Sequence, residues 1–238
     1  MGAIYTPVPG LAVYAQYATG VDGLGNLISL SVGNAQFNLA HGRQVEVGVK
    51  DEFLGGRVQF TLAGYQINKT NLLYVDPVTL ATQQVGEQSS RGIEASLSLR
   101  VTDLLRINAN LAVLRAKYDT FTGTNAAGQI QSFAGDVPMN VPQQVANVFL
   151  AYDFAPHWEA RLGVQAVGKI YGDNGDTVPL HPFATVNTQL EYRVSRNVTL
   201  TGRVYNLLNS VYATSAYSAT QAILGAPRTY EIAADYRF

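Results

Sequence analysis

The sequence predicts an all-β fold, namely about ten antiparallel strands of a transmembrane β-barrel. Three observations indicate this class. Apolar and polar residues alternate through long segments, the connections between these segments alternate between short and long, and aromatic residues gather beside the short connections. Each feature is typical of barrels that cross an outer membrane with strands. We therefore expect a multi-pass protein of the outer membrane of a Gram-negative bacterium.

Apolar residues recur at every second position, with almost no helical periodicity. In Arg106–Lys117, for example, Leu111 belongs to the apolar face and Asn110 to the polar face. The segments run to about 9–12 residues, which suits a tilted membrane strand, whereas soluble strands average ~5–6 residues. The ten expected strands are Leu11–Thr19, Arg43–Phe53, Arg57–Asn68, Ser90–Val101, Arg106–Lys117, Gln143–Phe154, Trp158–Gly168, Phe183–Val194, Val198–Asn206 and Arg228–Phe238.

The connections between the expected strands alternate strictly in length. The short ones are Leu54–Gly56, Thr102–Leu105, Ala155–His157 and Ser195–Asn197. The long ones are Gly20–Gly42, Lys69–Ser89, Tyr118–Pro142, Ile170–Pro182 and Leu207–Pro227. Outer-membrane barrels have short periplasmic turns and long extracellular loops. With an even number of strands, both ends of the chain are expected on the periplasmic side.

Aromatic residues on the apolar face accompany the short connections and the C-terminus. They are Phe53, Tyr152, Phe154, Trp158, Tyr192, Tyr236 and Phe238. Such a band is typical of the aromatic girdle at a membrane interface.

Composition excludes several other classes. Charged residues make up 14% and hydrophobic residues 47% of the chain, which does not suit a disordered protein. No stretch approaches the ~18 consecutive apolar residues of a transmembrane helix. Basic and acidic residues number 16 and 17 and are mixed, so we expect no nucleic-acid partner. The first residues lack the charged and apolar regions of a signal peptide, so the start is artificial or the chain is part of a longer product.

Several stretches resemble TonB-dependent receptors of the siderophore branch. Gln44–Asp76 is similar to the family's hairpin of two strands around a short turn that contains glycine. "VGEQSSRGIEASLSL" (Val85–Leu99) resembles the start of a strand in siderophore receptors. "RVYNLLNSVYATSA" and "GAPRTYEIAADYRF" resemble the family's last two strands, which finish in an aromatic residue.

The resemblance implies a 22-stranded barrel with a plug domain inside it. Residues 1–238 would be the C-terminal part of that barrel, without the plug. The implied function is uptake of ferric siderophores or a similar metal chelate, energised by TonB through the N-terminal part, so this chain alone should not transport actively. The other implied partners are outer-membrane lipid and the barrel-assembly machinery, which would read the terminal aromatic strand with Tyr236 and Phe238 as an assembly signal.

Candidate ligand-binding residues lie in the long connections. Aromatic rings there can stack on a flat iron chelate, and few Arg or Lys residues accompany them, which argues against a strongly anionic ligand. Each ring can equally be a girdle or loop-packing residue. The candidates are Tyr74, Tyr118, Phe121, Phe133, Tyr171, Tyr212 and Tyr217.

The sequence leaves other functions open as alternatives. A passive porin-like or structural barrel would have neither plug nor energy source, and a soluble β-module would be extracted without detergent. An enzyme is not expected, because His41, His157 and His181 lie in or beside separate connections and no nucleophile motif accompanies them. No cofactor is expected. The segment Gly172–Asp176 offers oxygen ligands for Ca²⁺, but a solvated turn is the simpler interpretation.

Overall fold

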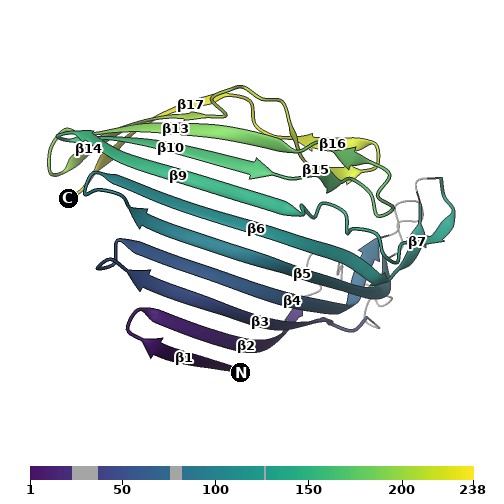
Figure 1. Ribbon diagram of the computed structural model, residues 1–238. Helices are drawn as coiled ribbons and strands as arrows, with labels where there is room; N and C mark the ends of the chain where they lie inside the picture. The colour runs from purple at the N-terminus through teal and green to yellow at the C-terminus, as the bar shows by residue number, and fades with distance from the viewer. Residues whose placement is uncertain (23–36, 76–81, 126) are drawn as a thin grey trace.

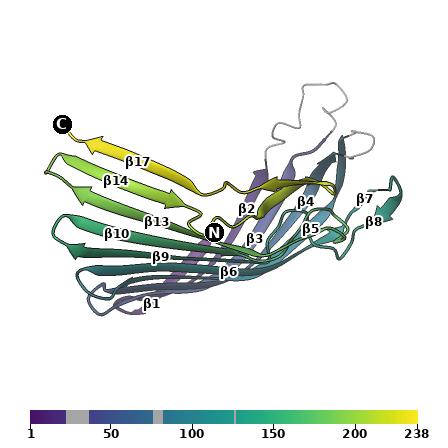
Figure 2. The same cartoon turned by 90° about the horizontal axis from the view of Figure 1, so that it is seen from above.

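Eleven antiparallel strands form one curved sheet in the computed structural model, which describes residues 1–22, 37–75, 82–125 and 127–238 (Figures 1 and 2). The strands are β1 (Gly2–Val8), β2 (Leu11–Asp22), β3 (Ala40–Phe53), β4 (Val58–Val75), β5 (Thr82–Arg100), β6 (Leu105–Thr120), β9 (Gln144–Ala155), β10 (Trp158–Val167), β13 (Phe183–Arg193), β14 (Val198–Tyr205) and β17 (Thr229–Tyr236). Each pairs with the next along the chain, and β1 and β17 are the two edges. The sheet is therefore an open part of a barrel wall, and the predicted fold class is confirmed.

Three small hairpins lie at the end of the sheet that carries the long connections, on the right of Figure 1. They are β7 (Thr122–Thr124) with β8 (Ile130–Ser132), β11 (Ile170–Tyr171) with β12 (Pro179–Leu180), and β15 (Ala213–Ser218) with β16 (Gln221–Leu224). We call this the outer end of the sheet. The outer connections are thus partly ordered into hairpins.

Strand β1 was missed by the sequence prediction. It has seven residues, and its pairing with β2 shifts between Tyr5 and Val8, around Pro7, which has no backbone N–H to donate. The expectation that both chain ends lie on the periplasmic side is therefore wrong for Met1. Its carbonyl accepts a hydrogen bond from the Tyr17 N–H at 2.8 Å, in the half of β2 nearer the outer end.

Several strands are longer than the apolar pattern predicts. Strands β4 and β5 remain paired up to Val75 and Thr82, so most of the expected connection Lys69–Ser89 is strand. Much of the expected connection Gly20–Gly42 lies outside the described residues. Backbone pairing does not need an apolar face, so it continues above the membrane where the side-chain alternation ends.

The two faces of the sheet follow the predicted register. One row of paired residues crosses the sheet as Val13, Val49, Leu62, Ala95, Leu111, Ala146 and Ala166, and we call this the apolar face. The adjacent row on the opposite, luminal face is Lys50, Thr61, Ser96, Asn110, Asn147, Gln165 and Thr185. In that row, the Asn147 amide donates to the Asn110 side chain at 2.8 Å.

Phe149 is an aromatic residue on the luminal face, where the alternation predicts a polar one. It is paired with Gly163, and a Cβ at Gly163 would come within 3.1 Å of its ring. The same arrangement joins Tyr14 to Gly48. Such rings cover strand glycines that have no side chain to pack.

The aromatic girdle lies at the end of the sheet opposite the outer end. Trp158 stacks on Tyr192 with ring centroids 4.4 Å apart, and Tyr236 meets Phe238 edge-on at 5.2 Å. Within the described part of the chain, no helix is long and apolar enough to span a membrane.

Candidate functional site

Four of the seven candidate aromatic residues form one cluster at the outer end. Phe121 is its centre, with ring centroids 4.9 Å from Tyr74, 4.6 Å from Tyr118 and 5.1 Å from Phe133. Phe121 and Phe133 are only 5% and 2% exposed. The cluster therefore attaches the β7–β8 hairpin to the ends of β4 and β6, and its two buried rings have little surface for a ligand.

The other three candidates lie apart from this cluster. Tyr212 stacks on Phe183 with centroids 4.3 Å apart. Tyr171 on β11 accepts a hydrogen bond from the Lys169 ammonium at 2.6 Å. Tyr217 on β15 is 77% exposed. Of the seven, Tyr217 presents its ring most openly to the outside.

Asn140 joins two of the outer hairpins. Its side-chain amide donates to the Ala216 carbonyl at 2.8 Å, and its side-chain oxygen accepts from the Ala216 N–H at 2.7 Å. Its own N–H donates to the Tyr171 carbonyl at 2.9 Å. The hairpins that carry Tyr171 and Tyr217 are thus joined to each other through Asn140.

Carboxylates between the outer hairpins titrate above their usual range. Burial, and then the Asp173 carboxylate, raise the pKa of Asp136 above its ordinary value of 3.8. Burial also raises the pKa of Asp176, with Asp136 and Asp173 adding to it, although the Val137 N–H lowers it. Asp173 itself accepts hydrogen bonds from the N–H groups of Thr177 and Val178 at 3.0 and 2.9 Å, as in a capped turn. These groups support the loop structure.

The luminal face carries an ion-pair network near the short turns. Glu159, only 3% exposed, lies between Arg106 and Arg161 and bonds to both. The network continues from Arg106 to Asp153 at 3.2 Å and from Asp153 to Arg193 at 3.0 Å. A buried carboxylate of this kind is tolerated because two guanidinium groups neutralise it.

Sequence analysis did not single out this network. The alternation along each strand puts Arg106, Asp153 and Glu159 on the luminal face. This alternation is the sequence signal that could have found them. Their contacts, however, join β6, β9 and β10, and they depend on the register between strands.

An open wall of long antiparallel strands, apolar on one face and charged on the other, with hairpins at one end, defines the class of outer-membrane β-barrels. The family model described as TonB dependent receptor-like, beta-barrel matches residues 1–207. The chain belongs to this family, whose matched members include outer-membrane receptors and transporters.

Individual relatives agree with this assignment. The chain is 25% identical over 248 residues to the probable TonB-dependent siderophore receptor PiuA of Acinetobacter baumannii, covering 100% of this chain and 33% of that protein. It is 27% identical to the ferrichrome outer membrane transporter/phage receptor of Escherichia coli, covering 85% of this chain and 27% of that protein. The chain thus spans about a third of the length of the curated relatives it matches.

Solved structures show the same fold. The crystal structure of the siderophore receptor PiuA from Acinetobacter baumannii superimposes with a TM-score of 0.84 at 24% identity, covering 99% of this chain and 35% of that one. The ferric-catecholate import receptor Fiu from Escherichia coli superimposes with a TM-score of 0.78 at 21% identity, covering 100% of this chain and 34% of that one.

Proposed function

We propose that this chain is the C-terminal part of the barrel of a receptor that takes up ferric siderophores or similar metal chelates across the outer membrane of a Gram-negative bacterium. The observation that carries the proposal is the family match over residues 1–207, combined with relatives that are named siderophore and ferrichrome receptors. The family match favours a receptor over a passive porin-like barrel. Binding and uptake, and not catalysis, are the proposed activities.

Ligand recognition is proposed for the outer end of the chain. Tyr217 and Tyr171 are the candidate stacking residues, because both lie on hairpins that Asn140 holds together. Tyr74, Tyr118 and Tyr212 are proposed to contribute from the same end. Phe121 and Phe133 are the packed support of Tyr74 and Tyr118, and Phe183 is that of Tyr212.

The luminal face is proposed to contact a plug domain supplied by the rest of the protein. Its charges are of both signs, and the side chains of Arg161 and Arg193 are about half exposed around the Glu159 network, so they suit hydrogen bonding to a polar globular surface. Energy from TonB would reach the ligand through that plug.

The test uses the complete receptor in its own host under iron limitation. Deletion of the gene should abolish uptake of at least one radiolabelled ferric chelate from a panel, and removal of TonB should have the same effect. Uptake of every chelate by the deletion strain, or uptake that persists without TonB, would refute the proposal.

The binding site is tested separately by substitution. Tyr217→Ala should weaken chelate binding about three- to tenfold, the usual range for loss of one aromatic contact. Ile130→Ala is the control, because Ile130 is 81% exposed on β8 of another outer hairpin. Equal binding by the two variants would remove Tyr217 from the site.

A further inference from the structure

Three of the outer connections meet at Asn140. Asn140 itself belongs to the connection between β8 and β9, Tyr171 to the β11–β12 hairpin and Ala216 to the β15–β16 hairpin. The Asn140 N–H donates to the Tyr171 carbonyl, and the Asn140 side chain exchanges two hydrogen bonds with the Ala216 backbone. Asn140 and Ala216 are 76 positions apart in the sequence, so the joint is a product of the tertiary structure.

The local backbone explains why an asparagine stands at this position. The Val141 N–H donates to the Pro138 carbonyl at 3.2 Å, which closes a turn with Asn140 as its third residue. Asn140 has a φ of 63°, and a left-handed third residue is typical of type II turns. Glycine and asparagine adopt this conformation most readily, and of the two only asparagine has a side-chain donor and acceptor. The turn therefore presents an amide to the neighbouring hairpin.

The side chain of Asn140 closes the free edge of β15. In an antiparallel strand, the N–H and the C=O of one residue point to the same side. Both groups of Ala216 bind Asn140, so β16 pairs with β15 on the opposite side. The Ala216 carbonyl belongs to the peptide that leads into Tyr217, whose ring is 77% exposed. Asn140 therefore holds the backbone directly before this ring.

The joint is tightly packed around Ala216. Ala216 is only 5% exposed, and Gly172 of the β11–β12 hairpin is also buried. A Cβ at Gly172 would come within 2.9 Å of the Ala216 Cβ, so the two hairpins touch without space for another side chain. Water has limited access to such a joint, and a hydrogen bond that water cannot readily replace is costly to lose.

A second set of contacts joins two of the three connections without Asn140. The Tyr118 hydroxyl donates to the Asn174 side chain at 2.8 Å, and the Val137 N–H donates to the Asp176 carboxylate at 3.2 Å. These bonds hold the β8–β9 connection and the end of β6 against the β11–β12 hairpin. The β15–β16 hairpin is added to this pair through Asn140.

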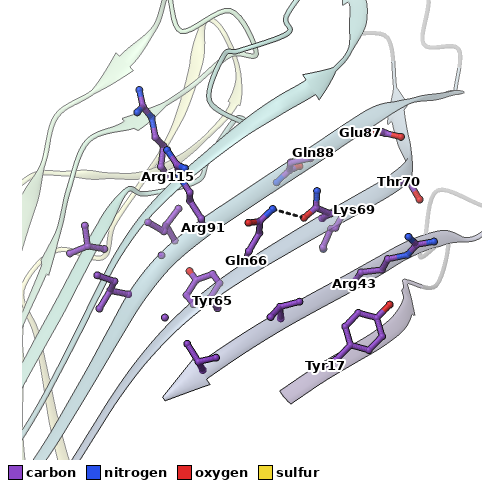
Figure 3. A pocket seen from close by; sticks show the side chains of 18 of the residues that line it. Tyr17, Arg43, Tyr65, Gln66, Lys69, Thr70, Glu87, Gln88, Arg91 and Arg115 are labelled. Carbon is purple, nitrogen blue, oxygen red and sulfur yellow. Dashed lines mark hydrogen bonds between the residues drawn. The ribbon is translucent and has the colours of Figure 1, made fainter. Parts of the chain in front are cut away.

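The outer ends of β3, β4 and β5 are built differently (Figure 3). There the strands lie side by side, and Gln66 donates to Asn68 of the same strand at 3.2 Å. A reciprocal pair of hydrogen bonds also joins the Gln84 side chain to the Asn38 backbone, but both bonds are exposed to solvent. Water can replace exposed bonds at little cost, so the partly buried joint at Asn140 is the firmer of the two.

We propose that Asn140 is a positioning residue for chelate binding, which holds the peptide before Tyr217 in its binding arrangement before the ligand arrives. The inference rests on the proposed function, in which Tyr217 stacks on the chelate. A hairpin that is already ordered loses less conformational freedom on binding, so the affinity is higher. Without the Asn140 bonds, only a fraction of the receptor has Tyr217 in place, and the apparent dissociation constant rises by the inverse of that fraction.

The test uses variants of the complete receptor in nonionic detergent. Asn140→Asp keeps the size and the acceptor of the side chain but removes the donor to the Ala216 carbonyl. Asn140→Gly keeps the left-handed backbone and removes both side-chain bonds. The control is Asn125→Asp, which adds the same charge in the β7–β8 turn, where the Asn125 side-chain oxygen accepts from Ala127 and Gln129 of its own hairpin. Heat-modifiable electrophoretic mobility verifies that each barrel is folded.

Hydrogen–deuterium exchange of the ligand-free receptor measures the joint without any chelate. The segment that contains β15 should exchange about tenfold faster or more in both Asn140 variants, because the paired bonds to Ala216 no longer hold it closed. Exchange in Asn125→Asp should match that of the native receptor in this segment. Native exchange of β15 in both Asn140 variants would overturn the proposal. If Asn140→Gly does not fold, Asn140→Asp decides the outcome alone.

Equilibrium binding then shows whether Asn140 acts through Tyr217. The probes are radiolabelled ferrichrome, ferrioxamine B and a ferric tricatecholate, and the variants are compared with the probe that the native receptor binds. Both Asn140 variants should weaken binding about three- to tenfold, and Asn125→Asp should leave it unchanged. In a Tyr217→Ala background, Asn140→Gly should cause no further loss, because the residue that it positions is already gone.

Two binding results would overturn the proposal. One is native affinity in both Asn140 variants. The other is a loss from Asn140→Gly that is equally large with and without Tyr217, as expected if Asn140 only stabilises the fold. The proposed function fails in a different way, namely when the native receptor binds none of the probes, and this inference then fails with it.

Discussion

At the residue scale, whether a side chain faces lipid or the lumen depends on its odd or even position along the strand. Leu111 and Asn110 are adjacent in the chain, yet Leu111 lies on the apolar face and Asn110 bonds to Asn147 on the luminal face. The same rule separates Arg106, which is paired with Glu159 on the luminal face, from Arg115, which lies exposed on the apolar face of β6. The environment of the side chains therefore changes from one residue to the next along a strand.

This alternation can be measured with two substitutions to arginine. Leu111→Arg places a charge near the middle of the lipid band and should lower the free energy of unfolding by roughly 2–4 kcal/mol. Asn110→Arg enters the polar lumen and should cost less than about 1 kcal/mol, since it removes one exposed hydrogen bond. The measurement is reversible folding of the complete receptor into lipid. Equal losses for the two variants would contradict the register.

At the element scale, neighbouring strands are joined by aromatic rings that cover glycines. A Cβ at Gly48 would come within 2.6 Å of the Tyr14 ring, whose hydroxyl donates to Glu46 at 2.7 Å. A Cβ at Gly163 would similarly meet Phe149. These contacts link β2 with β3 and β9 with β10, and they give a close fit that a larger residue would disturb.

The first of these contacts predicts a difference between two glycines of β3. Gly48→Ala must displace the Tyr14 ring and should lower the free energy of unfolding by about 1–2 kcal/mol. Gly42→Ala is the control on the same face of the same strand, because its Cβ would find nothing nearer than 3.9 Å. Gly42→Ala should be neutral or slightly stabilising. Denaturant unfolding in detergent compares the stabilities of the two variants. Identical unfolding midpoints would contradict the prediction, because they would show that the Tyr14 ring moves away from the new Cβ without cost.

At the scale of the whole molecule, the sheet has one end of short turns and one end of hairpins. The aromatic girdle occupies the first end, and the Asn140 contacts organise the second. This polarity predicts the orientation of the chain across the membrane. In that orientation Tyr217 lies outside, and the last residues of the terminal strand β17 lie at the inner interface.

The orientation can be checked with single cysteines, because the chain has none of its own. Ala127→Cys lies in the exposed β7–β8 turn, and Arg196→Cys lies in the exposed turn before β14. An impermeant thiol reagent added to intact cells should label position 127 and spare position 196. Lysed cells provide the control, in which both should react. The reverse pattern in intact cells would invert the topology.

The terminal strand is also proposed to be an assembly signal. Tyr230, Ile232 and Tyr236 share the outward face of β17, and Phe238 packs against Tyr236 at the end of the chain. Deletion of Phe238 from the complete receptor should sharply reduce the outer-membrane fraction, while the purified variant still refolds in detergent. Quantitative blotting of the membrane fractions measures this. Normal membrane levels would leave Phe238 only an anchoring role, in which loss of one exposed ring costs little.

The sequence by itself determined ten of the eleven strands of the sheet and the alternation of their two faces, because lipid imposes an apolar residue at every second position. Contacts between distant residues were decided by the tertiary structure. The cluster of Tyr74, Phe121 and Phe133, the Glu159 network, and the apposition of Arg91 with Arg115 all depend on register between strands. Strand β1 was also recognisable only by its pairing with β2, since a short strand interrupted by Pro7 has too weak a local pattern. Alternation is a local property of the chain, whereas register is set by backbone pairing across the sheet.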